Sequence, residues 1–548
     1  MLTRRAALLL AVPVALVLVG YVLWPALQTF GLGIGHLGEF FGGWRSANVR
    51  ALVNSVGISL ATVAGASVVG TGLAWGLWRY GLYPTALRRA LQAAAALPLA
   101  LPPLVGVLAF LFLYGETGIL PRALRDGLGL AEVPFGFDGL SAVWLVHVYA
   151  FYVYFFLFAT AALRDLDASL LEASADLGAS GWRAFRRVVL PLLRPALVGA
   201  SLLVFMLSMA SFTAPLLFAG TEPFLTVQIY NLKLNGDLAL SAAVSTVLTA
   251  ICLAFLFLLE AKPGRNLLGA SKGTARPVQP IGGPAAWVAG VGVGVVLLFV
   301  VLPILTVGLI SFADASSWTV EILPQRWTLA NYASLFADPQ FFDPIANSLQ
   351  MATLATVLNV VFGVAVAVVI AQRTVPGRWL IRTLAVLPFA IPGTVIALNL
   401  IVTFSQPSPL SAGQVLVGSF WILPLAYFIR HIPLVVRATT AALEGFDERL
   451  TEASADLGAS TWTTFRCVVW PAILPGVAAG TLLTFVASLG EFVSSIMLYV
   501  FGNRPISVEI LAQLRLYEFG AAAAYSVLLM VLVGLSTLVL RFAGTRPG

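Results

Sequence analysis

The chain has 548 residues, of which 59% are hydrophobic and only 10% are charged, and its mean hydropathy is +0.95. Soluble domains carry roughly 25% charged residues, so this chain has too few charges to cover a globular surface. Composition therefore excludes a soluble enzyme, a disordered protein and a secreted disulfide scaffold, and it indicates an integral membrane protein. The net charge of +7 comes from basic residues scattered between apolar runs, which favours topology signals over nucleic-acid binding.

Apolar runs long enough to cross a bilayer recur along the whole chain. A membrane-spanning helix needs about 20 mostly apolar residues, and runs this uniform do not fit the alternating pattern of a membrane barrel. The sequence therefore predicts an all-α fold with about twelve spans. We place them at 6–30, 51–78, 87–115, 140–163, 195–221, 239–261, 286–312, 345–372, 379–404, 412–436, 473–500 and 519–541.

The distribution of Lys and Arg predicts the orientation. With the N-terminus inside, 23 of the 31 basic residues, Arg430 among them, fall on the inner side of this scheme. Cytoplasmic segments carry an excess of Lys and Arg, so we expect both termini in the cytoplasm. The first apolar run, which follows Arg4 and Arg5, is interpreted as a retained anchor because no small-residue cleavage site interrupts it before Trp24.

The chain contains an internal repeat. The segment EASADLGAS at 172–180 recurs unchanged at 452–460, which is 280 positions later. Weaker matches extend outward, including Asn54-Ser55 against Asn347-Ser348. The repeat predicts a tandem duplication of six spans plus six. We expect a first domain at 1–262, a cytoplasmic linker at 263–285 and a second domain at 286–548.

Each copy of the repeated segment lies between the fourth and fifth spans of its half, on the predicted inner side. The pattern predicts a short helix over 170–177, a turn at Gly178 and a second amphipathic helix that stops at the Leu190-Pro191 step. The product is a helical hairpin that projects into the cytoplasm. Two identical hairpins suggest two copies of one docking partner.

These residues resemble a known family. Glu172-Ala173-Ser174, Gly178 and Leu190-Pro191, with their second copies, resemble the EAA loop of inner-membrane permeases in binding-protein-dependent ABC importers. Ser stands at the third position in both copies, and Trp470 stands where Leu is usual. Each six-span half then resembles one type I importer permease domain, so the resemblance covers essentially the whole chain.

The resemblance implies a role for the hairpins and for partners of the chain. Their short helices would be coupling helices that seat in two copies of an ATP-hydrolysing subunit, and a soluble binding protein would deliver the substrate. ATP and magnesium would be bound by the ATPase, and this chain would not itself be an enzyme. The residues implicated in ATPase coupling are Glu172, Ala173, Ser174, Asp176, Leu177, Gly178, Glu452, Ala453, Ser454, Asp456, Leu457 and Gly458.

Other sequence features set aside competing interpretations. The chain has no G-x-x-x-x-G-K-[ST] phosphate loop, and its three histidines, His36, His147 and His431, show no metal-ligand spacing. We therefore expect no metal site and no cofactor in this chain. A twelve-helix secondary transporter is the alternative from another class, but such carriers place coupling carboxylates inside the membrane, and here Glu491 is the main acidic residue at that depth.

The substrate is indicated only by similarity. The segments around Ser211 and Glu491 make the chain most similar to ferric-iron permeases, with thiamine, phosphonate, polyamine and sulfate permeases as alternatives. Ser211 and Glu491 occupy matching positions 280 residues apart, and we place Glu491 about 19 residues into the eleventh span. The two residues are therefore candidates for the translocation path. A structural role for Glu491, bonded to backbone groups beside Gly490, remains the alternative.

Overall fold

The computed structural model describes residues 4–43, 46–80, 85–130, 132–133, 136–261, 282–314, 318, 322–372 and 374–544. Regular structure in these ranges is helical, and Ala313 and Trp327 form an isolated bridge. Eleven of the described helical segments are long and apolar enough to cross a membrane, and one bent helix pair brings the number to twelve. The predicted all-α fold with about twelve spans is therefore confirmed.

The first half contains the predicted six spans, some of them divided into shorter helices. They are α1 (Arg4–Val17) continuing through a π-helical turn (Leu18–Leu23) into α2 (Trp24–Ile34), α4 (Ala47–Arg79), α5 (Thr85–Ala95) with α6 (Leu97–Ala100) and α7 (Pro103–Tyr114), α9 (Gly139–Arg164), α12 (Leu190–Met209) and α15 (Leu238–Ala261). The corresponding helices of the second half are α16 (Pro284–Ile310), α19 (Pro339–Ala371), α20 (Arg378–Ala390) with α21 (Gly393–Phe404), α22 (Ile422–Glu444), α25 (Trp470–Leu489) and α28 (Phe519–Gly544).

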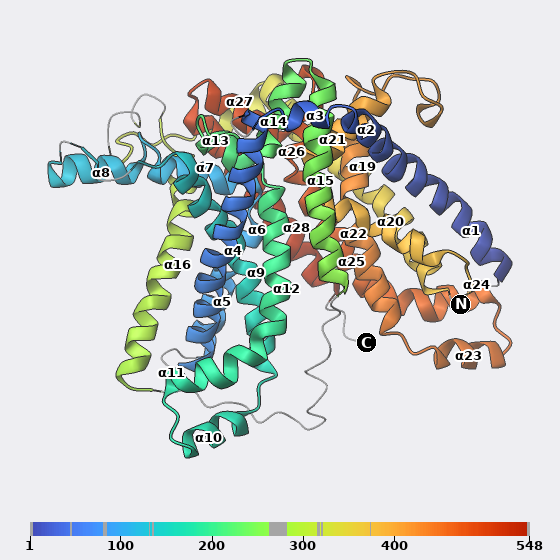
Figure 1. Cartoon of the computed structure of the whole chain (residues 1–548), viewed down its shortest axis with the longest axis horizontal. Helices are drawn as coiled ribbons and strands as arrows, with labels where there is room; N and C mark the ends of the chain where they lie inside the picture. The colour runs from blue at the N-terminus through green and yellow to red at the C-terminus, as the bar shows by residue number, and fades with distance from the viewer. Residues whose placement is uncertain are drawn as a thin grey trace.

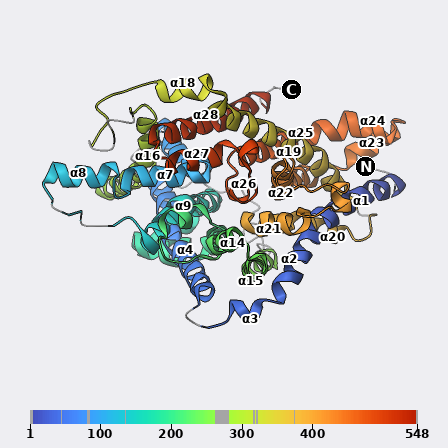
Figure 2. The same cartoon turned by 90° about the horizontal axis from the view of Figure 1, so that it is seen from above.

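The halves pack in the same way and exchange their first helices. In the first half α4 packs along α9, and α12 lies against both; in the second, α19, α22 and α25 make the same three contacts. Figure 2 shows the two sets side by side, with α21 and α26 (Val493–Leu498) between them. Each half's first span packs on the third span of the other half, as α2 does on α21 and α16 on α7. This exchange joins the two halves into one bundle.

The third and ninth spans are broken at prolines. The predicted run 87–115 is divided at Leu101-Pro102, and the run 379–404 bends by 111° between α20 and α21, at Ile391-Pro392. Proline has no N–H to continue the helix and excludes helical backbone at the residue before it. The tenth span begins later than predicted, at Ile422, because Gly413 and Gly418 adopt left-handed backbone with φ of 77° and 85°.

The prediction that the second helix of a hairpin stops at its proline, Pro191 or its counterpart Pro471, is wrong. The helix runs through Pro191 from Gly181 to Met209, and through Pro471 from Thr461 to Leu489. A π-helical turn precedes each proline, and Leu190 N donates to Phe185 O, five residues back. This wider turn accommodates the proline ring that would clash with an α-helical carbonyl. The fifth and eleventh spans therefore begin and end earlier than predicted.

The structure bears less directly on the domain boundaries. Most of the predicted linker at 263–285 lies outside the described residues, so the boundaries stay predictions. Figure 1 shows α1 beginning, and α28 ending, towards the side on which both hairpins project. The two ends of the described chain therefore share a side with the hairpins, as the predicted topology requires.

Candidate functional site

The short helix and the glycine turn of both hairpins form as the repeat predicts. In the first, α10 (Ala168–Asp176) leads to Gly178, which has φ of +75°; in the second, α23 (Arg449–Asp456) leads to Gly458, with φ of +81°. A Cβ at either glycine would meet nothing within 4 Å, so the left-handed backbone alone explains the glycine. The next helix starts with a serine cap, since Arg183 N donates to Ser180 Oγ at 3.4 Å, and the second copy repeats this cap at Ser460.

The exposed residues of the two hairpins are the same. Glu172, Ala173, Asp176 and Leu177 are exposed, as are their counterparts Glu452, Ala453, Asp456 and Leu457. Leu177 and Leu457 are each 88% exposed at the hairpin tip, where an apolar side chain has no partner within the described chain. Leucines this exposed at two identical tips are typical of a docking surface for another protein.

The serines of the repeat point inward instead. Ser174 is buried and its hydroxyl donates to Leu171 O at 2.8 Å, while Ser454 Oγ lies 2.9 Å from Thr464 Oγ1 within the second hairpin. Of the twelve residues predicted for coupling, these two therefore hold the hairpins in shape. Figure 1 shows that both hairpins project from the same side of the bundle and lie well apart.

The second group of candidate residues lies where the fifth and eleventh spans end. Met209 ends α12 and α13 begins at Thr213, while Leu489 ends α25 and α26 begins at Val493. Glu491 therefore lies in a helix break and not within a continuous span as predicted. The two breaks meet at the boundary between halves, because the buried rings of Phe212 and Phe492 lie 6.1 Å apart. A Cβ on Gly490 would come within 3.2 Å of Pro102, in the first half.

Hydrogen bonds stabilise the helix break of the first half, between α12 and α13. His147, on α9, lies 2.8 Å from Ser211 Oγ through Nε2 and 3.0 Å from Ser208 Oγ through Nδ1. Thr226 Oγ1 donates to the Ser211 carbonyl at 2.6 Å. Each bond satisfies a buried polar group at a point where the helix ladder is interrupted.

The second-half break is built on the same plan but carries charge. Ser507 Oγ donates to the Glu491 carbonyl at 2.8 Å, as Thr226 does to Ser211. The Glu491 carboxylate accepts from both the backbone N and the Oγ of Ser494 at 3.0 Å. Its other oxygen lies 2.9 Å from Arg430 Nε and 3.8 Å from His431 Nε2. Glu491 is 6% exposed, so the carboxylate is paired and bonded inside the bundle.

The partners of Glu491 were not predicted from the sequence. Arg430 was counted among the inner-side charges, but it lies within α22 and its side chain reaches Glu491. His431 is buried and its Nδ1 lies 2.9 Å from Ser488 Oγ. Within the described part of the chain, no three His, Cys, Asp or Glu side chains lie close enough together to hold a metal ion.

Comparison with known proteins identifies the family. The family model described as the binding-protein-dependent transport system inner membrane component matches residues 66–261 and again residues 359–546. The chain belongs to this family. The two matches confirm the duplication, and the chain is a fused, multi-pass inner-membrane permease of an ABC importer. A permease of this family works with an ATPase and a binding protein, which sets aside the secondary-transporter alternative.

Similar proteins match either most of this chain or about half of it. The permease is 33% identical over 480 residues to a probable ABC transporter permease protein, y4fN, of Sinorhizobium fredii, covering 85% of this chain and 82% of that one. It is 26% identical over 512 residues to the Fe(3+)-transport system permease protein FbpB 2 of Haemophilus influenzae, covering 91% and 90%. The sulfate transport system permease protein CysT of Escherichia coli is 32% identical over 254 residues, covering 44% of this chain and 90% of its own.

Proposed function

We propose that this permease imports ferric iron, driven by two copies of an ATPase subunit that dock on its two hairpins. The observation that carries the docking role is the pair of identical tips, each with an 88% exposed leucine, on one side of the bundle. ATPase closure would move both rigid hairpins together and, through the continuous helices 181–209 and 461–489, reach both central breaks. ATP and magnesium belong to the ATPase in this arrangement.

The central breaks form the proposed gate of the translocation path. Phe212 and Phe492 meet there from opposite halves, and α13 (Thr213–Phe218) and α26 continue towards the side away from the hairpins. Ser211 and Glu491 precede these rings and face buried polar groups. Separation of the two rings would open a route that passes the neutral Ser211 in the break of the first half and the charged Glu491 in the break of the second half.

Ferric iron is proposed from the full-length similarity to the Fe(3+)-transport permease and from the Glu491 carboxylate, an oxygen ligand suited to a hard cation. The test is radioactive uptake in cells that express the permease with its ATPase and binding protein. We expect uptake of ferric iron that requires all three proteins. Uptake of sulfate, thiamine, phosphonate or polyamine without iron would overturn the substrate and leave the importer role standing.

The proposed orientation places both termini and both hairpins in the cytoplasm. Single cysteines introduced at positions 376 and 330 separate the two orientations, because these positions lie on opposite sides of the predicted topology. We expect an impermeant thiol reagent added to intact cells to label position 330 and not position 376. The reverse pattern would contradict the scheme.

A further inference from the structure

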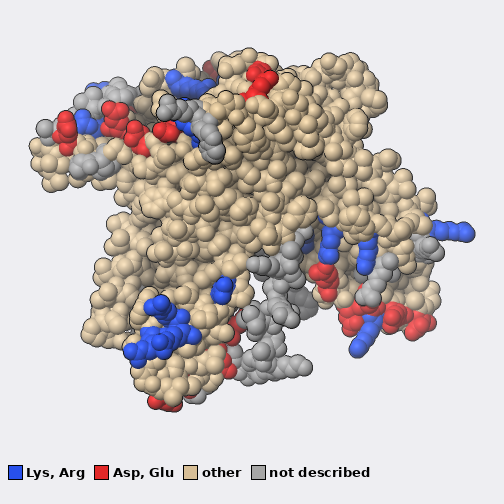
Figure 3. Space-filling view, viewed as in Figure 1, with Lys and Arg blue, Asp and Glu red and all other residues tan. Residues whose placement is uncertain are grey.

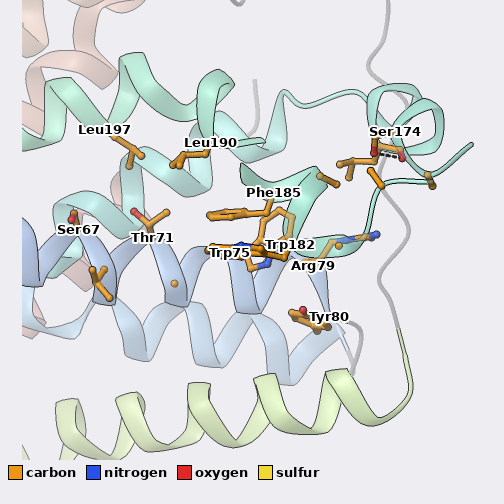
Figure 4. A pocket seen from close by; sticks show the side chains of 17 residues that line it. Ser67, Thr71, Trp75, Arg79, Tyr80, Ser174, Trp182, Phe185, Leu190 and Leu197 are labelled. Carbon is orange, nitrogen blue, oxygen red and sulfur yellow. Dashed lines mark hydrogen bonds between the residues drawn. The ribbon is translucent and has the colours of Figure 1, made fainter. Parts of the chain in front are cut away.

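An open cavity of about 750 Å³ lies between the hairpin end of α4 and the first hairpin (Figure 4). Three aromatic rings in contact line it: Trp182 stacks on Phe185 with centroids 5.6 Å apart, and Trp75 is tilted against Phe185 with centroids 4.9 Å apart. Arg79 and Tyr80, at the end of α4, stand at one end of this aromatic cavity. Its volume falls within the roughly 300–1,000 Å³ of small-molecule sites.

The surface next to the cavity is strongly basic. Arg183, Arg186 and Arg187 are all exposed on the helix that carries Trp182 and Phe185. Figure 3 shows Lys and Arg gathered over the first hairpin, at the lower left of the view. The matching positions 280 residues later are Thr463, Arg466 and Cys467, so two of the three charges are absent from the second hairpin.

The cavity also lacks its lining residues in the second half. Val368 stands at the position matching Trp75, and Trp470 stands at the position matching Leu190. The Trp470 ring lies 6.3 Å from Phe465 and packs on the buried cluster that contains Val368. A cavity of about 1060 Å³ also lies beside the second hairpin, but its lining includes the carboxylates of Glu444, Glu448 and Glu452. The described lining of the cavity at the first hairpin has no carboxylate, although the two tips are identical.

We propose that this cavity binds an anionic phospholipid, with an acyl chain against Trp75, Trp182 and Phe185 and the phosphate at Arg79, the arginine of the lining. The exposed Arg183, Arg186 and Arg187 on the neighbouring surface add to the attraction of the anionic headgroup. Tryptophan and tyrosine are favoured at the level of lipid headgroups, and basic pockets at the cytoplasmic end of spanning helices bind anionic headgroups. Val68, on the cavity wall and 73% exposed, lies on the apolar outer stripe of α4, which gives an acyl chain access from the bilayer. A neutral headgroup would gain the apolar contacts but not the ionic ones.

Native mass spectrometry of the full-length permease with dioleoyl phosphatidylglycerol and dioleoyl phosphatidylethanolamine tests this site. Leu190→Trp introduces the side chain that stands at the matching position of the second half, and so fills the cavity. Arg186→Gln removes one charge beside it. Arg466→Gln, the same change on the second hairpin, is the matched control.

We expect phosphatidylglycerol to be retained over phosphatidylethanolamine, with retention lowered about tenfold or more by Leu190→Trp. Arg186→Gln should weaken phosphatidylglycerol binding about fivefold, which is the contribution of one basic residue to the attraction of an anionic lipid surface. Arg466→Gln should leave phosphatidylglycerol binding unchanged. Equal retention of the two lipids, or unchanged retention in Leu190→Trp, would overturn the proposal.

A second measurement does not depend on the folding of the Leu190→Trp variant. Phosphatidylglycerol brominated on its acyl chains quenches tryptophan fluorescence on contact. In lipid nanodiscs we expect this lipid to quench the tryptophan fluorescence of the permease. We expect Trp182→Phe to reduce the fraction of the fluorescence that is quenched. A quenched fraction that does not change with Trp182→Phe would show that no acyl chain lies in the cavity.

Discussion

Glu491→Gln is the most informative single change at the central break. The carboxylate is 6% exposed and pairs with Arg430, whose side chain is 26% exposed. Breaking a buried ion pair by removing one partner costs about 3–5 kcal/mol, because the other charge is left uncompensated. The partial exposure of Arg430 places the cost near the lower end, and glutamine keeps an acceptor for Ser494. We therefore expect a loss of about 2–3 kcal/mol.

A double-mutant cycle separates the ion pair from other effects of the change. If Glu491 and Arg430 compensate one another, Arg430→Gln should also destabilise the permease, and the double variant should lose clearly less than the sum. Stability would be followed by thermal unfolding of the purified permease in nanodiscs. Ser211→Ala, at the matching position of the first half, removes only a neutral hydroxyl and should cost about 1 kcal/mol. Additive losses in the cycle would refute the pairing.

Transport measured in the same variants addresses the path. Lost ferric uptake per folded Glu491→Gln permease, with intact basal ATPase activity, is the expected result for a carboxylate at the gate. Unchanged uptake would leave Glu491 as a structural residue that bonds the start of α26 and would remove it from the path. The two outcomes are distinguishable because yield and uptake are measured separately.

The hairpins give two further predictions. Leu177→Asp or Leu457→Asp should each weaken co-purification of the ATPase about tenfold, because each removes the free energy of burying one leucine side chain at the docking surface. The double variant should abolish co-purification. Recovery of as much ATPase as with the wild-type permease would contradict the docking role. Gly178→Val and Gly458→Val force a β-branched residue into left-handed backbone at a cost of about 1–2 kcal/mol or more. We expect them to uncouple ATP hydrolysis from uptake without loss of membrane insertion. Full transport by the double variant would refute the coupling role.

The sequence predicted the hairpins better than the core of the bundle. A repeat of nine residues with a glycine in each turn is a local signal, and both turns adopt the expected left-handed backbone at Gly178 and Gly458. The helix breaks were missed because hydropathy averages over a run and treats Pro102 or Pro392 as one more apolar residue. The Arg430–Glu491 pair was missed because the two residues are 61 positions apart in the sequence, and packing of α22 against α26 brings their charged groups within 2.9 Å.

Comparison of the halves did contain a signal for that pair. The positions matching Arg430 and Glu491 in the first half are Ala150 and Ser211, so one half carries both charges and the other carries neither. Burial explains this pattern, because a lone ionised group inside the membrane is costly and a pair is much less so. A fused chain can place such a pair on one side of the gate only, whereas a symmetric dimer of identical subunits would have to carry it on both.

The pattern predicts the outcome of moving the charge to the first half. Ser211→Glu alone would place a carboxylate beside His147 without an arginine, and we expect folded yield to fall sharply, by an amount consistent with about 3 kcal/mol for an unpaired buried charge. Adding Ala150→Arg, on the same α9 helix, should restore much of that yield. Ala150→Arg alone should also be defective, since its charge would then lack a partner. Equal yields for the single and double variants would show that the two positions do not face one another as Arg430 and Glu491 do.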